Sequence, residues 1–383
     1  MQIAIDTQPL IGSRLTGIGY CQAGQLTALS ALYPSDTFSL QYFTGRDGAP
    51  KQARLKPYLQ ANVQMQSAAA SGYAYRMAST FLPLPYHHYF GKKADVTHFF
   101  NYIVPPGVFG KTVVTVHDMV YKTYPETVRG RTKYMLQLGL KKSLVRADRI
   151  VTDSEFSKSE ICRYFPQFQD KIRVVYCGVN TKRFHPIDDP EKIREVREKY
   201  ALDRDYFLYL GTVEPRKNLV RLIEAYQIFI QGKKTPPYLV LAGGKGWLNS
   251  DIYQKATALG IEKNVKFTEY IPEELLCPLM CGALAFVFPS IYEGFGMPPL
   301  EAMACGVPVL ASNAASLPEV VGEDAVLVDP YRPDEIAGGL ERLYTDQALR
   351  VRLSEAGKKR VLHFSWERSA QQLHAVYEEL YHA

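Results

Sequence analysis

Short, almost unbroken apolar runs alternate along the chain with stretches of helical periodicity. In the first half, this pattern predicts strands at 2–6, 38–43, 95–100, 112–118, 149–154 and 172–179. It predicts helices between them at 18–32, 134–146 and 154–164. Strands that are apolar on both faces are typical of parallel sheets with helices on either side. The first half is therefore predicted to form one doubly wound α/β domain.

The same alternation resumes after a polar segment that contains two prolines. That segment, 184–205, is predicted to be a linker followed by a helix that opens the second domain. Beyond it the pattern predicts strands at 206–212, 238–243, 265–270, 284–290, 307–312 and 325–329, and helices at 219–231, 252–259, 272–281 and 299–305. We therefore expect two α/β domains, 1–185 and 186–364, and an amphipathic helix at 365–383.

The composition is that of a soluble globular protein, with 46% hydrophobic and 22% charged residues among 383. No apolar run approaches the roughly 18 residues of a membrane span, and the first residues lack the features of a signal peptide. Cys277 and Cys281 can share one helix face, but no His or Cys pair stands near them in sequence to complete a zinc site. We expect buried free thiols in a reducing cytoplasm and no metal site.

The positive charge is concentrated in the first half of the chain. The net charge is +12 over residues 1–185 and −6 over residues 186–383. This asymmetry favours an anionic partner for the first half, such as nucleic acid, a lipid surface or a phosphorylated acceptor, although a solvated basic surface explains it equally well. Aromatic residues interleaved with His and Lys at 73–76 and 84–93 suit a membrane surface, a nucleic-acid strand or an ordinary helix.

Two glutamates, Glu293 and Glu301, flank a Gly- and Pro-rich loop directly after the strand predicted at 284–290. The backbone N–H groups that are candidates to point at an anion there belong to Phe295, Gly296, Met297 and Leu300. Ionised carboxylates only accept hydrogen bonds, so two of them beside such an anion site predict a ligand with both phosphate and hydroxyl groups. The alternative is a simple tight turn, with Glu301 placed favourably against the helix dipole.

Two adjacent cations, Arg216 and Lys217, follow the first strand of the second domain. At the carboxyl end of a parallel strand they are well placed to neutralise a pyrophosphate, the Arg through its fork of donors and the Lys as a point charge. The alternative is a pair of exposed loop charges.

Other strand ends carry further candidate residues. His117 and Asp118 end the strand predicted at 112–118, and Asp118 is expected to orient the histidine, serve an acceptor or cap a helix. Gly17 and Gly19 can admit a phosphate or a sugar, but they are a poor dinucleotide fingerprint and argue against an NAD enzyme. Gly243, with Lys245 beside it, lies in another glycine-rich strand end, which is either a ligand contact or a simple turn.

The sequence resembles the retaining glycosyltransferases of family 4. The resemblance rests on the E-x7-E pair within SIYEGFGMPPLEAMACGVPV, and is supported by GTVEPRKN, AGGKGW, the His117–Asp118 pair, TGIGY and NAASLPEVVG. These motifs span nearly the whole chain in the order of the family. One position departs from some relatives, which have an additional Arg where this chain has Thr212.

The resemblance implies a GT-B fold, in which two Rossmann-like domains face a cleft and the last helix crosses back to the first domain. It implies that Glu301 binds the ribose and Glu293 a hydroxyl of the donor sugar. Arg216 and Lys217 are expected to hold the diphosphate together with the loop amides. His117 is expected to contact the sugar from the first domain, and the segment around Ile271 to contact the base, partly through its backbone.

The motif sequences are most similar to those of bacterial transferases that use GDP-mannose in surface polysaccharide synthesis. The implied acceptor is a glycan or a polyprenyl-diphosphate-linked oligosaccharide, reached from the cytoplasm at the inner face of the membrane through the basic first domain. Neither a metal cofactor nor nucleic acid is expected. A UDP-sugar donor, a different GT-B reaction and a non-catalytic sugar-binding module remain as alternatives.

Overall fold

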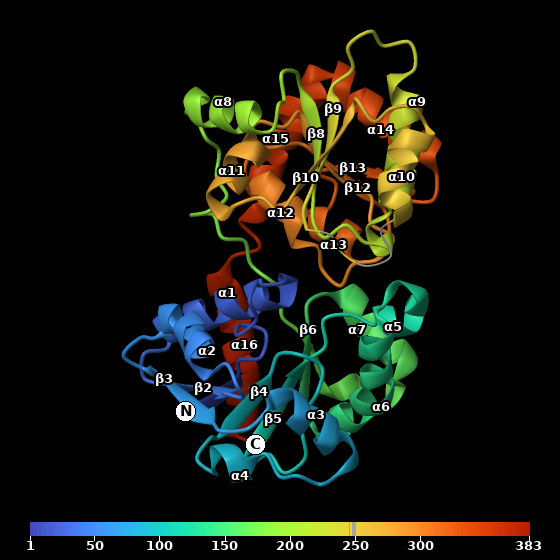
Figure 1. The fold of residues 1–383 in the computed structure, drawn as a ribbon. Coiled ribbons are helices and arrows are strands. Elements are labelled where there is room, and N and C mark those ends of the chain that lie inside the picture. Colours follow the sequence, from blue (N-terminus) through green and yellow to red (C-terminus); the bar gives the residue numbers. More distant parts are fainter. Residues whose placement is uncertain (245, 247–249) are drawn as a thin grey trace. The chain divides into compact units, whose positions relative to one another are not determined.

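The computed structural model describes residues 1–244, 246 and 250–383 of the chain. It forms two compact units, one of Met1–Gly178 with Ser365–Ala383 and the other of Val179–Phe364 (Figure 1). The boundary between the two units falls after Gly178, whereas the sequence pattern predicted it after His185. Each unit is a parallel sheet whose strands are connected through helices, as the alternating apolar pattern predicted.

The first unit contains a seven-stranded parallel sheet in the order β3-β2-β1-β4-β5-β6-β7. Its strands are β1 (Gln2–Asp6), β2 (Thr37–Phe43), β3 (Val63–Ala68), β4 (Val96–Phe99), β5 (Lys111–Thr115), β6 (Arg149–Thr152) and β7 (Ile172–Val174). The pattern did not predict β3, because this edge strand exposes several of its polar positions and lacks an apolar run. The predicted strand at 112–118 ends earlier, at Thr115, so His117 lies in the loop beyond it.

Helices cover the first sheet, and one of them comes from the far end of the chain. They are α1 (Gly17–Leu32), α2 (Gly48–Leu55), α3 (Gly72–Phe81), α4 (His87–Phe90), α5 (Val120–Thr123), α6 (Gly130–Arg146), α7 (Glu155–Tyr164) and α16 (Trp366–Tyr381). Leu373 and Tyr377 of α16 are fully buried in the core formed by β1, β2 and α1. Figure 1 shows this helix in red among the blue elements, so the C-terminal segment belongs to the first unit.

The second unit contains a six-stranded parallel sheet in the order β10-β9-β8-β11-β12-β13. Its strands are β8 (Tyr206–Leu210), β9 (Tyr238–Ala242), β10 (Val265–Glu269), β11 (Ala285–Phe288), β12 (Val309–Ser312) and β13 (Val326–Val328). The chain runs outward from β8 to β10, then returns to β11 beside β8 and runs outward the other way. The topological switch point therefore lies between β8 and β11, where ligands of such sheets bind.

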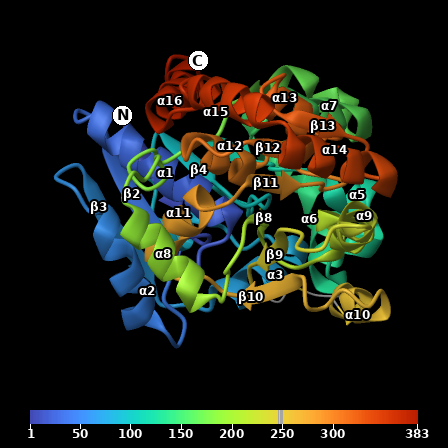
Figure 2. The ribbon, with the colours of Figure 1, turned by 90° about the horizontal axis from the view of Figure 1, so that it is seen from above.

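The helices of the second unit are α8 (Pro190–Lys199), α9 (Leu219–Ile230), α10 (Ser250–Ala258), α11 (Glu273–Cys281), α12 (Met297–Ala304), α13 (Leu317–Val321), α14 (Pro333–Thr345) and α15 (Gln347–Val361). Helix α8 lies beside α11 in both views (Figures 1 and 2), and α12 packs on α15. Over the described residues, no helix combines the length and apolarity needed to cross a membrane.

Candidate functional site

The loops after β8 and β11 bring three predicted site residues together at the switch point of the second sheet. Arg216 and Lys217 lie on a single 3-10 turn, Pro215–Lys217, directly after β8. Glu293 lies in the loop between β11 and α12, 76 residues from Lys217 in sequence. Adjacent parallel strands end at the same sheet edge, so the topology itself makes these loops neighbours.

Both cations donate hydrogen bonds to the carboxylate of Glu293. One carboxylate oxygen accepts a hydrogen bond from Lys217 Nζ at 2.6 Å, and the other accepts from Arg216 Nη1 at 2.7 Å. Arg216 also donates to the Glu214 carboxylate at 2.8 Å and to the Tyr292 carbonyl at 2.9 Å. Two cations and two carboxylates therefore form a balanced network. Glu214, which sequence reasoning missed, supplies the second negative charge.

The network is buried, and this burial determines how its charges behave. Glu293 and Lys217 are only 6% and 8% exposed. Burial disfavours the charged carboxylate, but Arg216 and then Lys217 outweigh it and lower the pKa of Glu293 below its ordinary value. Burial and the neighbouring Arg216 lower the pKa of Lys217, although Glu293 opposes the shift. The site is thus a desolvated set of charges, in which electrostatic interactions are stronger than in water.

Hydrogen bonds from other loops hold the Glu293 loop in position. Ser316 Oγ lies 2.9 Å from the Glu293 carbonyl and 2.8 Å from the Phe295 carbonyl. The Asn218 amide donates to the Pro289 and Pro330 carbonyls at 3.1 and 2.6 Å. Asn218 adopts a left-handed conformation with φ of 62°, which asparagine tolerates better than most residues. These hydrogen bonds join the loops after β8, β11, β12 and β13.

Gly296 provides the turn that leads into α12. Its φ is 104°, and a Cβ at this position would lie 2.6 Å from Leu317 Cδ2. Only glycine fits this conformation and this space. The predicted amide donors lie around it, because Phe295 precedes the glycine and α12 begins at Met297. The first-turn N–H groups of a helix have no partner within the helix, so the arrangement suits an anion.

Glu301 lies in α12, and its surroundings differ from those of Glu293. Among the residues that the structure describes, none donates a hydrogen bond to its carboxylate. Burial raises the pKa of Glu301 to about 7, and the more distant charge of Arg183 only partly opposes this shift. Glu301 therefore remains available to accept hydrogen bonds from a ligand, and its charge changes near neutral pH.

The other residues of the second unit predicted to bind the donor are Leu300, Ile271 and Gly243, and they are largely buried. Leu300 is fully buried and Ile271 is 3% exposed, so the N–H of Leu300 and the backbone of Ile271 are the groups left to act. Gly243 packs against the end of β8, where an added Cβ would lie 1.9 Å from the Gly211 carbonyl oxygen. The role that the structure shows for Gly243 is thus this close approach of two strand ends. Lys245 lies outside the described residues.

In the first unit, His117 is fully engaged by protein groups. Its Nδ1 lies 2.6 Å from Asp153 Oδ2, and its Nε2 lies 2.9 Å from the Phe100 carbonyl oxygen. Burial disfavours a charged ring, but Asp153 overcomes this effect and raises the pKa of His117 to about 9. At neutral pH the ring is therefore an imidazolium that donates from both nitrogens. It is not a free base.

The carboxylate that orients His117 is Asp153, and not the adjacent Asp118. Asp118 Oδ1 accepts from the Val120 N–H at 3.1 Å, which is the helix-capping role considered for it. Sequence spacing could not find Asp153, because it follows β6, 36 residues away, and only strand pairing makes it a neighbour of His117. Gly17 is the exposed first residue of α1, and Gly19 is buried in its first turn.

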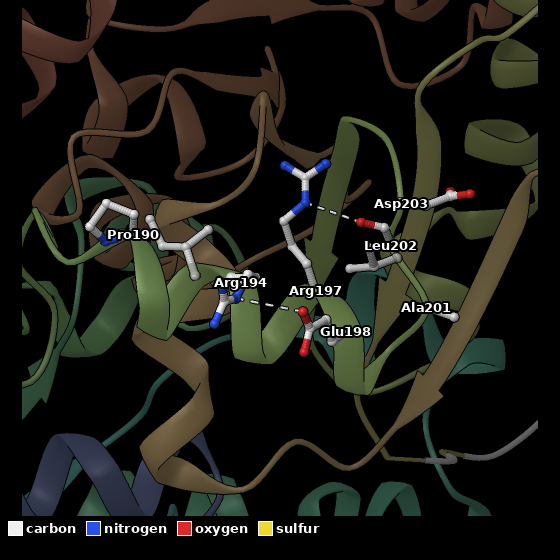
Figure 3. A pocket seen from close by; sticks show the side chains of 8 residues that line it. Pro190, Arg194, Arg197, Glu198, Ala201, Leu202 and Asp203 are labelled. Atoms are coloured by element: carbon white, nitrogen blue, oxygen red, sulfur yellow. Dashed lines mark hydrogen bonds and ion pairs between the residues drawn. The ribbon is translucent and has the colours of Figure 1, made fainter.

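A hollow on the second unit lies apart from these residues. It has a volume of about 360 Å³ and is lined by Pro190, Ile193, Arg194, Arg197, Glu198, Ala201, Leu202 and Asp203 (Figure 3). Its charged groups mostly bind protein, since Arg197 Nε donates to the Leu202 carbonyl and Arg194 pairs with Glu198. None of the predicted site residues lines it, so we do not assign it to the ligand.

Two family descriptions match the chain, one for each half. Residues 44–183 match Glycosyltransferase Family 4, and residues 191–360 match Glycosyl transferases group 1. Among curated proteins, the O-antigen chain mannosyltransferase B of Escherichia coli is 38% identical over 276 residues. The alignment covers 70% of this chain and 71% of that protein.

Solved structures with the same fold match over the full length. Sucrose-phosphate synthase from Thermosynechococcus elongatus superposes with a TM-score of 0.76 at 22% identity, covering 100% of this chain and 99% of that one. HepE from Anabaena in complex with UDP and glucose gives a TM-score of 0.70 at 18% identity, covering 99% of both chains. At such identities the likeness concerns the fold alone, and it places both halves of the chain in the GT-B architecture.

Proposed function

The chain belongs to glycosyltransferase family 4, and on that premise we propose that it is a retaining transferase that uses GDP-mannose. Its acceptor is proposed to be a glycan or a lipid-linked glycan of surface polysaccharide synthesis. The choice of mannose is supported by the 38% identity to a mannosyltransferase of O-antigen synthesis. The observation that carries the catalytic part is the Arg216–Lys217–Glu293 network, together with Glu301 eight residues further on, whose carboxylate accepts no hydrogen bond from the described residues.

The network suits a donor with a charged centre between two hydroxylated ends. Arg216 and Lys217 supply positive charge for the diphosphate, and the N–H groups of Phe295, Gly296 and Met297 add neutral donors. Glu301 accepts from the ribose hydroxyls, since its carboxylate has no partner among the described residues. Glu293, kept ionised by the two cations, accepts from a hydroxyl of the sugar.

The proposed reaction breaks the bond between the anomeric carbon and the diphosphate oxygen, and forms one to the acceptor oxygen on the same face of the sugar. The departing diphosphate carries the bonding electron pair, and its oxygen takes the proton that the acceptor hydroxyl loses. Arg216 and Lys217 stabilise the negative charge that grows on that diphosphate. Both cations are already desolvated and positioned by Glu293 and Glu214, so little reorganisation is needed when the charge develops.

His117 is proposed to supply a fixed positive charge and not to accept a proton. Both of its nitrogens donate to protein groups, so the ring has no lone pair to offer the acceptor. We propose that its place near the sugar depends on Asp153, which holds the ring in one orientation. Asp118 is proposed to act beside it through its cap on the following turn.

Slow hydrolysis of the donor tests the proposal directly. The purified protein is offered GDP-mannose, GDP-fucose, UDP-glucose, UDP-galactose and UDP-N-acetylglucosamine separately, and released nucleoside diphosphate is measured. We expect turnover of GDP-mannose, with loss of the signal in Glu293→Ala and no change in Glu274→Ala, an exposed glutamate of α11. Turnover of a UDP-sugar would replace the proposed donor. If no donor releases nucleoside diphosphate and none raises the melting temperature of the protein, a non-catalytic binding module would be favoured.

We also propose that the first unit rests on an anionic membrane surface. Exposed apolar residues lie on helices α3, α4 and α6 and at the C-cap of α3, each at least 38% accessible: Tyr73, Phe81, Leu82, Tyr89, Tyr134 and Val145. Basic side chains lie among them, since the Arg131 guanidinium is 3.9 Å from the Tyr73 ring centre and Lys142 Nζ donates to the Thr80 carbonyl. Exposed aromatic residues with Lys and Arg suit the headgroup region.

Flotation with liposomes that contain anionic lipid tests this surface at low salt. We expect binding that falls as salt is raised, and a several-fold loss of binding in Leu82→Ser. The matched control is Leu362→Ser, which removes an exposed leucine of the second unit. Failure of the wild-type protein to float would refute the membrane proposal without affecting the donor proposal.

A further inference from the structure

Three cysteines of the second unit converge, although only two of them are near each other in sequence. Cys277 and Cys281 lie one turn apart on α11, and Cys305 follows the last residue of α12. Cys277 Sγ is 3.8 Å from Cys305 Sγ and 4.0 Å from Cys281 Sγ, and all three sulfurs lie within 4.8 Å of one another. The three are free thiols, as expected from the sequence, but Cys305, which is distant along the chain, joins the other two.

The sulfur separations suit a thiolate metal site. With metal–sulfur bonds of about 2.3 Å in tetrahedral geometry, neighbouring sulfurs lie about 3.8 Å apart. Two of the separations match this value without any rearrangement. A disulfide has a sulfur–sulfur distance of about 2.05 Å, so the three cysteines are free thiols in contact with one another.

The three cysteines are largely buried, and one backbone carbonyl lies close to the sulfurs of two of them. Cys277 and Cys305 are 7% and 5% exposed, whereas Cys281 is partly exposed. The His185 carbonyl oxygen lies 3.3 Å from Cys277 Sγ and 3.4 Å from Cys281 Sγ. A metal ion held by the three sulfurs would thus lie near the His185 carbonyl, in the segment that enters the second unit.

We propose that Cys277, Cys281 and Cys305 form a binding site for one thiophilic metal ion, of which Zn²⁺ is the expected occupant. Soft thiolate ligands select zinc over magnesium or calcium. The site is structural in this proposal, because it lies at the opposite end of α12 from Gly296. It joins α11 to α12, and the Cys305 N–H donates to the Glu301 carbonyl at 3.1 Å. Metal binding would therefore fix the end of the helix that carries Glu301.

Titration of the reduced, desalted full chain with Cd²⁺ under anaerobic conditions tests the site. We expect a thiolate-to-metal absorption band that saturates at one equivalent and is competed away by Zn²⁺. Cys281→Ser should weaken binding at least tenfold, while Cys162→Ser, which removes a lone cysteine of α7, should leave it unchanged. Absence of the band in the wild-type chain, or a band unaffected by Cys281→Ser, would overturn the proposal.

A second measurement avoids dependence on the folding of a variant. Alkylation of the wild-type chain by iodoacetamide is followed residue by residue with mass spectrometry, with and without Zn²⁺. We expect Zn²⁺ to slow modification of Cys281 at least tenfold and to leave Cys162 unaffected. Equal rates at Cys281 with and without Zn²⁺ would contradict the site.

Discussion

Glu293 and Glu301 are eight residues apart and both lie largely out of solvent, yet their environments shift their pKa values in opposite directions. Glu293 meets Arg216 and Lys217, which lower its pKa. Glu301 meets no hydrogen-bond donor among the described residues, and burial raises its pKa to about 7. One acid is already part of a closed ionic network, whereas the other keeps its hydrogen-bonding capacity for a ligand.

The difference shows that burial alone does not define the role of a carboxylate. A buried charge is stable when partners compensate for the lost water, and it is costly when they do not. Glu293 therefore contributes to the folded state as well as to the proposed chemistry. Glu301 is retained at a cost to the fold, which is the pattern expected of a binding residue.

The largest expected effect is a difference in unfolding free energy between variants of Glu293 and of Glu301. Glu293→Gln leaves the buried Lys217 and the partly buried Arg216 without their shared carboxylate, and breaking such a network costs about 3–5 kcal/mol of unfolding free energy. Glu301→Gln removes a charge that burial disfavours, so at pH 8 we expect it to leave stability unchanged or raise it. Urea denaturation of both variants measures the contrast. Equal losses in the two variants would contradict it.

The next effect concerns the leaving group. Arg216→Ala is expected to lower kcat about 10²- to 10³-fold, because it removes a preorganised charge from the developing diphosphate. Arg332→Ala, which removes an exposed arginine of the same unit, is the matched control and should change kcat little. Steady-state kinetics with the donor identified by hydrolysis measures both. A change confined to KM would argue against a role of Arg216 in the transition state.

A smaller effect is a pH dependence that belongs to Glu301. Its carboxylate ionises near pH 7 in the folded chain, and only the ionised form accepts from both ribose hydroxyls. The donor KM should therefore fall as pH rises from 6 to 8. Glu301→Gln should raise KM about tenfold, as expected for a lost charge-assisted hydrogen bond, and flatten this dependence. A wild-type KM that does not change across this range would refute the assignment.

The raised pKa of Glu301 also makes the stability of the folded chain depend on pH. The pKa of Glu301 is higher in the folded chain than its ordinary value of 4.5. Its contribution to stability is therefore fully present below pH 4.5 and is lost as pH rises through about 7. The difference in unfolding free energy between wild type and Glu301→Gln, measured from pH 5 to 8, isolates this contribution from other titrating groups.

The smallest expected effect lies in the first unit. Asp153→Asn removes the carboxylate that keeps His117 charged, so the pKa of His117 should fall from about 9 by more than one unit. We expect turnover to fall about tenfold, and Asp118→Asn to leave that pKa unchanged. NMR titration of the His117 ring protons measures the shift. An unchanged pKa in Asp153→Asn would show that another group holds the proton.

Local pattern predicted most of the second unit and the residue types of its site. Apolar runs located its six strands to within a few residues, because most of these strands are buried on both faces and carry few polar positions. The edge strand β3 of the first unit was missed because it lacks such a run. The motif after β11 placed Glu293, Gly296 and Glu301 in the loop and helix where they are found, since glycine and proline determine the local backbone.

The sequence alone therefore indicated the order of the strands in the second unit, the family and the residue types at the sheet edge. The folding of the chain set which of these groups meet. It paired His117 with Asp153 instead of Asp118, engaged Glu293 but not Glu301, and brought Cys305 to Cys277. The physical reason is that backbone preferences act over a few residues, whereas ionic and thiol contacts join strand and helix ends that are tens of residues apart in the chain.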